Sequence, residues 1–185
     1  MRRIASLLAL LTVSLVVAGC AVAGSVDGPG IRTVSARDQG EVPENTTAFD
    51  DDVPAIARLD PALRRALQDA SSRAAADGLT VRINSGWRSP EMQERLLRDA
   101  IDTYGSREEA SRWVATPETS AHVSGDAVDV GPWDAADWLD RHGAAFGLCR
   151  IYVNEPWHFE LRPDAATDGC PRQYLDPTED PRVAG

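Results

Sequence analysis

The stretch SAHVSGDAVDV, Ser120–Val130, decides the expected fold, because a histidine and a glycine precede a short run of alternating apolar and polar residues that contains Asp129. The stretch EPWHFEL, Glu155–Leu161, repeats this order, since an acid and then His158 lead into an apolar run. Such alternation is typical of a strand with one buried face. If the two runs are neighbouring antiparallel strands, the alternation places His158 and Glu160 on one face.

Helix signals surround these two runs. Asp60 before Pro61 and Ser89 before Pro90 are residue types preferred at an N-cap and at the first helical position. The apolar spacing and the closing glycines predict helices at 60–77, 89–104, 106–115 and 132–147, and strands at 79–86 and within 150–162. The expected fold class is therefore α+β, with a small, mostly antiparallel sheet flanked by helices.

The first residues carry the features of an export signal. Arg2 and Arg3 form a positively charged start, and the apolar run Ile4–Gly19 follows and leads directly to Cys20. The segment VAGC resembles a bacterial lipobox, in which the cysteine becomes a lipidated N-terminus. We therefore expect a lipoprotein signal peptide at 1–20 and an extracytoplasmic protein anchored to the bacterial cell membrane through Cys20. The alternative is a plain secretory signal and a secreted protein.

The remaining chain divides by composition. Residues 21–52 contain many Gly, Ser, Asp, Glu and Thr and few large apolar residues, which predicts a flexible tether. Residues 53–162 hold the helix and strand patterns and form the expected domain. Residues 163–185 are rich in proline and acids, which predicts a tail with little regular structure.

Cysteine count and charge limit the partners and the compartment. Cys149 and Cys170 remain after removal of the signal peptide, and an even number in an exported protein favours a disulfide between them. A buried thiol is the alternative. The formal net charge of −10, without a basic stripe, argues against a nucleic-acid partner. Nothing in the sequence points beyond a monomer.

The histidines and acids of the two opening stretches can form a metal site. Two imidazoles and a carboxylate, from His122, His158 and Asp129, suit Zn²⁺ and leave one tetrahedral position open for water, as in catalytic sites. Glu155, three residues before His158, is placed to take a proton from that water. Pro156 disfavours a helix at this point, so the ligands are expected on loops and strands.

Each of these residues also has a structural interpretation. A histidine at the start of a strand is often a hydrogen-bonding residue, Asp129 can be a strand-edge acid, and Glu155 can be a surface acid. His142, in LDRHGA, is expected to interact with a helix end and to take no part in the site. The co-occurrence of the other residues favours the metal interpretation.

Three motifs resemble those of the VanY-type D-alanyl-D-alanine carboxypeptidases, a family of zinc peptidases. Ser120–Asp129 matches the pattern Ser-x-His-x-x-Gly-x-Ala-x-Asp, and Glu155–His158 matches Glu-x-x-His. Upstream, SGWRSPEMQ at 85–93 is similar to Ser-Gly-Tyr-Arg-Ser-x-x-x-Gln, with Trp87 in place of the tyrosine. The resemblance spans roughly residues 54–162, which is the whole expected domain.

The resemblance implies the zinc-peptidase fold that is shared by lysostaphin-type peptidases, D-Ala-D-Ala peptidases and the Hedgehog domain. It implies that His122, Asp129 and His158 bind Zn²⁺ in a groove and that Glu155 is the catalytic acid and base. The motif residues thus receive the same roles that their chemistry suggests.

The resemblance also implies roles in substrate binding. Arg88 would bind a peptide carboxylate or stabilise a developing oxyanion, although it can instead be a structural residue at a helix start. Gln93 and Ser120 would contact the substrate. The implied enzyme is a zinc-dependent D-alanyl-D-alanine carboxypeptidase that hydrolyses the terminal D-Ala of peptidoglycan stem peptides through metal-activated water.

Other functions on the same fold remain open. An L,D-carboxypeptidase, a D-Ala-D-Ala dipeptidase and a cell-wall endopeptidase share the motifs, because these build the metal centre rather than the specificity pocket. A non-catalytic wall-binding module is a further alternative, but such a module has no need for Glu155.

Overall fold

A computed structural model describes residues 34–183 of the chain. The expected signal peptide, Cys20 and residues 21–33 of the expected tether lie outside the described residues. Within residues 34–183, no helix is long and apolar enough to cross a membrane.

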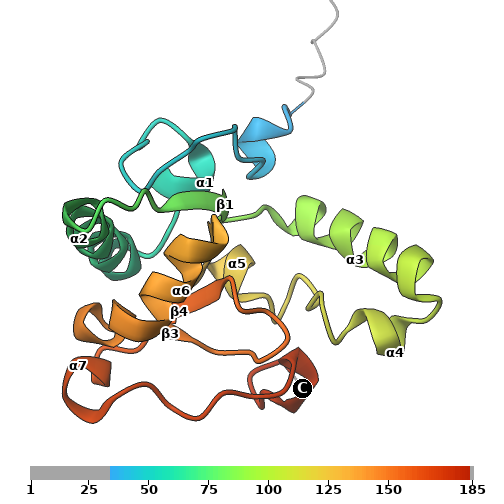
Figure 1. Ribbon diagram of the computed structural model, residues 1–185. Coiled ribbons are helices and arrows are strands. Elements are labelled where there is room, and N and C mark those ends of the chain that lie inside the picture. Colours follow the sequence, from blue (N-terminus) through green and yellow to red (C-terminus); the bar gives the residue numbers. More distant parts are fainter. Residues whose placement is uncertain (1–33, 184–185) are drawn as a thin grey trace, which may run out of the picture. The chain divides into compact units, whose positions relative to one another are not determined.

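A four-stranded antiparallel sheet lies at the centre of the fold (Figure 1). Its strands are β1 (Arg82–Ser85), β2 (Ala127–Gly131), β3 (Leu148–Arg150) and β4 (His158–Leu161), in the order β1-β2-β4-β3. The two runs of the opening motifs are the central neighbours β2 and β4, and they pair antiparallel. The expected α+β class and strand pairing are confirmed.

Short and long helices connect these strands. The α-helices are α1 (Pro54–Ala57), α2 (Pro61–Ala76), α3 (Pro90–Tyr104), α4 (Arg107–Ala110), α5 (Ala121–Ser124), α6 (Trp133–His142) and α7 (Ala165–Asp168). The 3₁₀ helices of the described residues are η1 (Arg37–Gln39), η2 (Gly143–Phe146) and η3 (Pro177–Glu179). The predicted caps are confirmed, because Asp60 accepts hydrogen bonds from the first turn of α2 and Ser89 accepts one from the first turn of α3.

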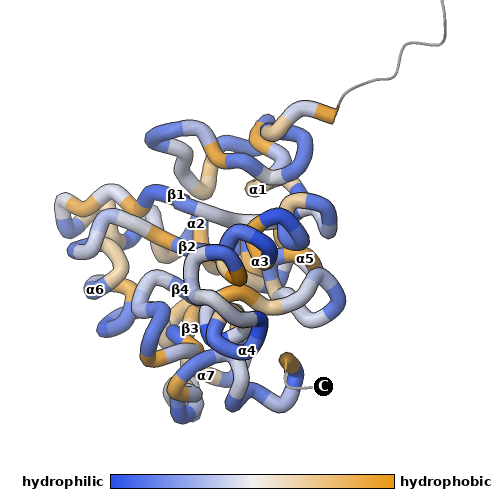
Figure 2. Tube along the Cα trace, turned by 90° about the vertical axis from the view of Figure 1, so that its right-hand side faces the viewer, coloured by the Kyte–Doolittle hydropathy of each residue, from blue (hydrophilic) through white to orange (hydrophobic). Residues whose placement is uncertain are grey.

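The helix expected at 106–115 is shorter in the structure. It ends at Ala110, and the chain then turns back so that the Ala115 carbonyl accepts a hydrogen bond from Gln93 in α3. A continuous helix would carry this carbonyl away from α3. The α3–α4 pair lies on the opposite side of the sheet from α2 in Figure 1, and much of its length is hydrophilic in Figure 2.

The main core lies between the sheet, α2 and α6. Leu63 and Leu67 of α2 are fully buried with Val128 of β2, Phe159 of β4 and Leu139 of α6. Burying a side chain of this size contributes about 1.5–3 kcal/mol. Because Val128 and Phe159 point into this core, the opposite faces of β2 and β4 are left for the polar residues of the site.

The segment 34–52 belongs to the folded unit, which differs from the expected tether. The Thr46 carbonyl accepts a hydrogen bond of 2.8 Å from the β1 residue Ile83, and the Gln39 carbonyl accepts one of 2.8 Å from Ser89. Thr46 and Ala48 are buried. Composition suggested disorder because the segment has few large apolar residues, but backbone hydrogen bonds to the edge strand hold it in place. The folded unit therefore begins before residue 53.

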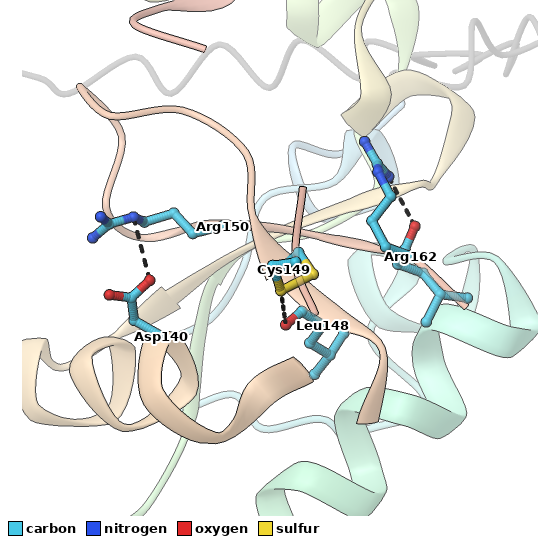
Figure 3. Close-up of a disulfide and its surroundings, with 7 residues drawn as sticks. Asp140, Leu148, Cys149, Arg150 and Arg162 are labelled. Atoms are coloured by element: carbon cyan, nitrogen blue, oxygen red, sulfur yellow. Dashed lines mark hydrogen bonds and ion pairs between the residues drawn. A yellow bond between two sulfur atoms is a disulfide. The ribbon is translucent and has the colours of Figure 1, made fainter. Parts of the chain in front are cut away.

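Residues 163–183 have little regular structure, as expected, but they pack on the domain. A disulfide joins Cys170 to Cys149 of β3 (Figure 3), which confirms the expected pairing. Beyond it, the amide of Tyr174 donates a hydrogen bond of 3.0 Å to the Ile151 carbonyl. The disulfide and these backbone bonds supply the order that the local composition does not predict.

Candidate active site

The register of the central strands brings the motif residues together. Asp129 of β2 lies directly opposite His158 of β4. His122 comes from the short helix α5, which ends at Gly125. A side chain at Gly125 would approach the Arg58 carbonyl to 2.6 Å, so this position of the motif requires glycine to let α5 pack against the chain before α2.

Three buried side chains converge on one point. Asp129 Oδ1 lies 3.1 Å from His158 Nδ1 and 3.4 Å from His122 Nε2. One ligand atom from each residue lies within 4.8 Å of the others. In a tetrahedral site with bonds of about 2.0–2.1 Å, neighbouring ligand atoms are about 3.3 Å apart. The donor atoms and their spacing therefore fit a divalent metal ion such as zinc.

The outer nitrogen of each imidazole has a hydrogen-bond partner. His122 Nδ1 lies 2.9 Å from the Gly86 carbonyl, and His158 Nε2 lies 3.3 Å from Glu160 Oε1. A ring N–H that donates to such an acceptor fixes the tautomer and leaves the other nitrogen free to bind a metal. Nε2 of His122 and Nδ1 of His158 are thus the nitrogens turned toward Asp129.

The electrostatics of the cluster match a cation site. Burial alone would lower the pKa of His158, but Asp129, Glu160 and Glu155 together raise it to about 10. Burial would raise the pKa of Asp129, but the charges of His122 and Arg88 and the bonds to the histidines hold it well below its usual range. The carboxylates around His158 thus favour a positive charge at this point, and a metal ion would bind the deprotonated Nδ1.

Glu155 lies beside the three residues but is not one of them. Its Oε2 is 3.7 Å from His158 Nδ1, and its buried Oε1 has no hydrogen-bond partner among residues 34–183. Burial, supported by the nearby Asp129 charge, raises its pKa to about 7 against the opposing effect of His158 and Arg88. A carboxyl group with a pKa near neutrality can both accept and donate a proton.

Arg88 contacts the cluster from the side of α3. Its Nη2 lies 2.9 Å from Asp129 Oδ2, its Nε donates to Ser85, and its Nη1 donates to Gln93 Oε1 at 3.2 Å. Gln93 is buried and also donates to the Ala115 carbonyl, so its amide holds Arg88 in place. The sequence-based role of Gln93 as a substrate contact stays a prediction, and the geometry adds a role in orienting the guanidinium.

All of these groups face one cavity of about 360 Å³. Arg88, Gln93, Ser120, His122, Asp129, Glu155 and His158 line it. Sequence reasoning did not identify the apolar part of the wall, where Tyr104 and Trp113 stack with their ring centroids 5.7 Å apart. Nor did it find Tyr152, whose ring centroid lies 5.2 Å from that of His158. No motif contains Tyr104, Trp113 or Tyr152, so their aromatic character was the only signal in the sequence.

Comparison with known proteins agrees with this geometry. Residues 56–164 match the model of the VanY family, described as D-alanyl-D-alanine carboxypeptidase. The chain belongs to this family. A D-alanyl-D-alanine carboxypeptidase of Enterococcus faecalis is 32% identical over 127 residues, which cover 55% of this chain and 47% of the relative. The chain therefore spans about half the length of this curated relative.

Two solved VanY structures share the fold. The vancomycin resistance D,D-pentapeptidase VanY from a VanB-type resistance cassette, in complex with Zn(II), has a TM-score of 0.56 at 30% identity over 60% of this chain and 76% of that chain. VanYB in complex with D-alanine-D-alanine has a TM-score of 0.55 at 30% identity over 60% of this chain and 75% of that chain. The expected family and fold are confirmed.

Proposed function

We propose that the chain is a zinc-dependent carboxypeptidase that removes the terminal D-Ala of peptidoglycan stem peptides. The observation that carries the proposal is the convergence of His122, Asp129 and His158 beside Glu155 at the wall of one cavity. VanY-family membership supports the reaction, and the two VanY structures, one with Zn(II) and one with D-alanine-D-alanine, support the metal and the substrate.

His122, Asp129 and His158 would hold the zinc ion through Nε2, a carboxylate oxygen and Nδ1. When bound, zinc supplies a Lewis acid that polarises a carbonyl group and lowers the pKa of water. The Gly86 carbonyl and the Glu160 carboxylate keep the two imidazole rings oriented toward that position.

Glu155 would move the proton. Its Oε1 has no hydrogen-bond partner among residues 34–183, and its Oε2 lies 3.7 Å from His158 Nδ1, so the carboxylate would be available to a water bound at the metal site. It would take one proton from a water whose oxygen bonds to the carbonyl carbon, and it would pass this proton to the nitrogen of the leaving D-alanine as the C–N bond breaks. Arg88, held by Ser85 and Gln93, presents a guanidinium to the carbonyl oxygen or to the peptide carboxylate.

We also propose that the protein acts outside the cytoplasm, anchored to the membrane through a lipid on Cys20. The charged start, apolar run and VAGC segment of residues 1–20 support this proposal. The disulfide between Cys149 and Cys170 is consistent with an oxidising compartment. Peptidoglycan, the proposed substrate, lies in the same compartment.

A muropeptide digest tests the reaction. The purified chain is incubated with pentapeptide and tetrapeptide muropeptides, with added zinc or with a chelator, and the products are identified by mass spectrometry. We expect the pentapeptide to lose a single D-Ala, the tetrapeptide to stay intact, and the chelator to stop the reaction.

Other products would contradict the proposal in distinguishable ways. Loss of one residue from the tetrapeptide indicates an L,D-carboxypeptidase, release of a D-Ala-D-Ala unit indicates a dipeptidase, and an internal cut indicates an endopeptidase. An intact substrate with zinc bound to the protein would indicate a wall-binding module.

A further inference from the structure

Residues 170–183, here named the strap, lie beyond the part of the chain that matches the VanY family, which ends at residue 164. The strap begins at the disulfide to Cys149 and runs alongside the loop that leads to Glu155. The amide of Val153 donates a hydrogen bond of 2.9 Å to the Tyr174 carbonyl, and that of Asn154 donates one of 3.2 Å to the Leu175 carbonyl. These backbone hydrogen bonds therefore place the strap next to the loop that leads to Glu155.

The far part of the strap reaches Glu160, the partner of His158. Arg182 Nη1 donates to Glu160 Oε2 at 2.6 Å, and Arg182 Nη2 lies 3.2 Å from Glu160 Oε1. Arg162 contributes one more hydrogen bond of 2.8 Å to Oε2. Glu160 is 1% exposed and its Oε1 lies 3.3 Å from His158 Nε2. The two-point contact with Arg182 fixes the plane of the carboxylate on which His158 depends.

A second contact from the strap reaches Tyr152, another neighbour of His158. The buried carboxylate of Asp180 accepts a hydrogen bond of 3.0 Å from the Tyr152 hydroxyl and also pairs with Arg182. The Tyr152 ring packs against the His158 ring. The strap thus holds two of the neighbours of this imidazole, the Glu160 carboxylate and the Tyr152 ring.

We propose that the strap is part of the metal centre, in which Arg182 is a positioning residue that fixes Glu160 and, through it, the metal-binding nitrogen of His158. This inference rests on the proposed metal-binding role of His158. A simple surface ion pair would contribute little, because solvent screens the attraction between exposed charges. Here the carboxylate is buried and bonded to a ligand, and loss of such an outer partner typically weakens metal binding by about 10–100-fold.

The test measures zinc affinity by competition with a chelator. Arg182→Met removes the guanidinium group that makes the two contacts with Glu160. The matched control is Arg172→Met, which removes the same charge from an exposed position of the strap. We expect Arg182→Met to weaken zinc binding by about 10–100-fold and Arg172→Met to leave it unchanged. Arg182→Lys keeps the positive charge but lacks the planar guanidinium group, so its zinc affinity should lie between those of wild type and Arg182→Met. Thermal melting of the metal-free proteins checks that each variant folds.

A double-mutant cycle separates positioning from general stability. If Arg182 acts through Glu160, then Glu160→Gln weakens zinc binding, and adding Arg182→Met to it causes little further loss. The visible absorption of the cobalt-substituted protein should also change in Arg182→Met, because the orientation of one ligand changes.

The outcomes distinguish this inference from the proposed function. Unchanged zinc affinity in Arg182→Met, or losses that simply add in the double variant, would overturn the role of the strap while the metal site stands. A folded wild-type chain that binds no zinc would overturn the proposed function itself, and the inference with it.

Discussion

The cluster of proposed metal ligands and the strap meet at His158, which belongs to the cluster and is held by the strap through Glu160. The sequence encodes the two regions in different ways. The cluster comes from two short motifs in which residue type and spacing follow directly from the chemistry of metal binding. The strap reaches the same histidine through Arg182, 22 residues away from Glu160 in an irregular segment. Reactive groups can therefore be predicted from local sequence patterns, whereas the groups that orient them depend on tertiary contacts.

The largest expected effect lies in the cluster. His122→Ala removes one of three protein ligands, and if zinc binding amounts to about 10–16 kcal/mol in total, one ligand accounts for several of these. We expect zinc affinity to fall by about 10³-fold, as measured by chelator competition. His142→Ala, which removes a histidine that stacks on Trp138 outside the site, is the control. Equal zinc affinity in His122→Ala and His142→Ala would show that His122 is not a metal ligand.

Arg88 contacts Asp129 of the cluster and is a proposed contact of the substrate, and a variant distinguishes its two proposed roles. Arg88→Met should lower activity by about 10²–10³-fold, the usual cost of losing one oxyanion donor. A fall in kcat at constant KM indicates oxyanion stabilisation, and a rise in KM indicates binding of the peptide carboxylate. Arg98→Met, on the exposed face of α3, should change neither. Wild-type kinetics in Arg88→Met would leave this residue with a structural role only.

The strap depends on its disulfide more than the cluster does. Replacing Cys149 and Cys170 together by serine opens a link with a sequence separation of 21. The chain-entropy estimate for a loop of this length is about 3 kcal/mol of stability. Urea unfolding should show this loss, and zinc affinity should fall less than in Arg182→Met, because the hydrogen bonds of the strap remain. A stability equal to that of the oxidised wild type would show that the strap needs no covalent anchor.

The smallest expected difference is between two glycine variants, and it concerns residues 34–52, which pack against the loop that carries Arg88. Gly40 has a φ of +108°, and a side chain there would lie 2.3 Å from the Trp87 carbonyl. Gly78 has a φ of +83° but no atom within 4 Å of such a side chain. Both alanine variants carry the backbone strain of about 1 kcal/mol or more, and Gly40→Ala adds a clash of about 1–3 kcal/mol. Similar melting temperatures for Gly40→Ala and Gly78→Ala would mean that residues 34–52 are not tightly packed against this loop.

Much of the domain could be predicted because its signals are local. Alternation identified β2 and β4, the Asp-Pro and Ser-Pro pairs identified the starts of α2 and α3, and the pairing of the two strands placed Asp129 against His158. Even the shared face of His158 and Glu160 follows from the period of a strand.

The remaining features could not be predicted, for a physical reason. Residues 34–52 and the strap have compositions that suggest disorder, and their order comes from backbone bonds, a disulfide and ion pairs to distant partners. Nothing near Arg182 in the sequence indicates that its partner is Glu160. The motif predicts that Gln93 contacts the substrate. The hydrogen bond that its side-chain oxygen accepts from Arg88 depends on the fold and is not indicated by the sequence.

The central claim is that His122, Asp129 and His158 hold one metal ion while Glu155 moves the proton. The most direct measurement compares zinc content and D-alanine release in the same preparations of wild type and Glu155→Gln. Our account predicts about one zinc per chain in both and a loss of turnover of about 10²–10⁴-fold in the variant. Full turnover in Glu155→Gln, or a folded wild-type protein without zinc, would contradict it.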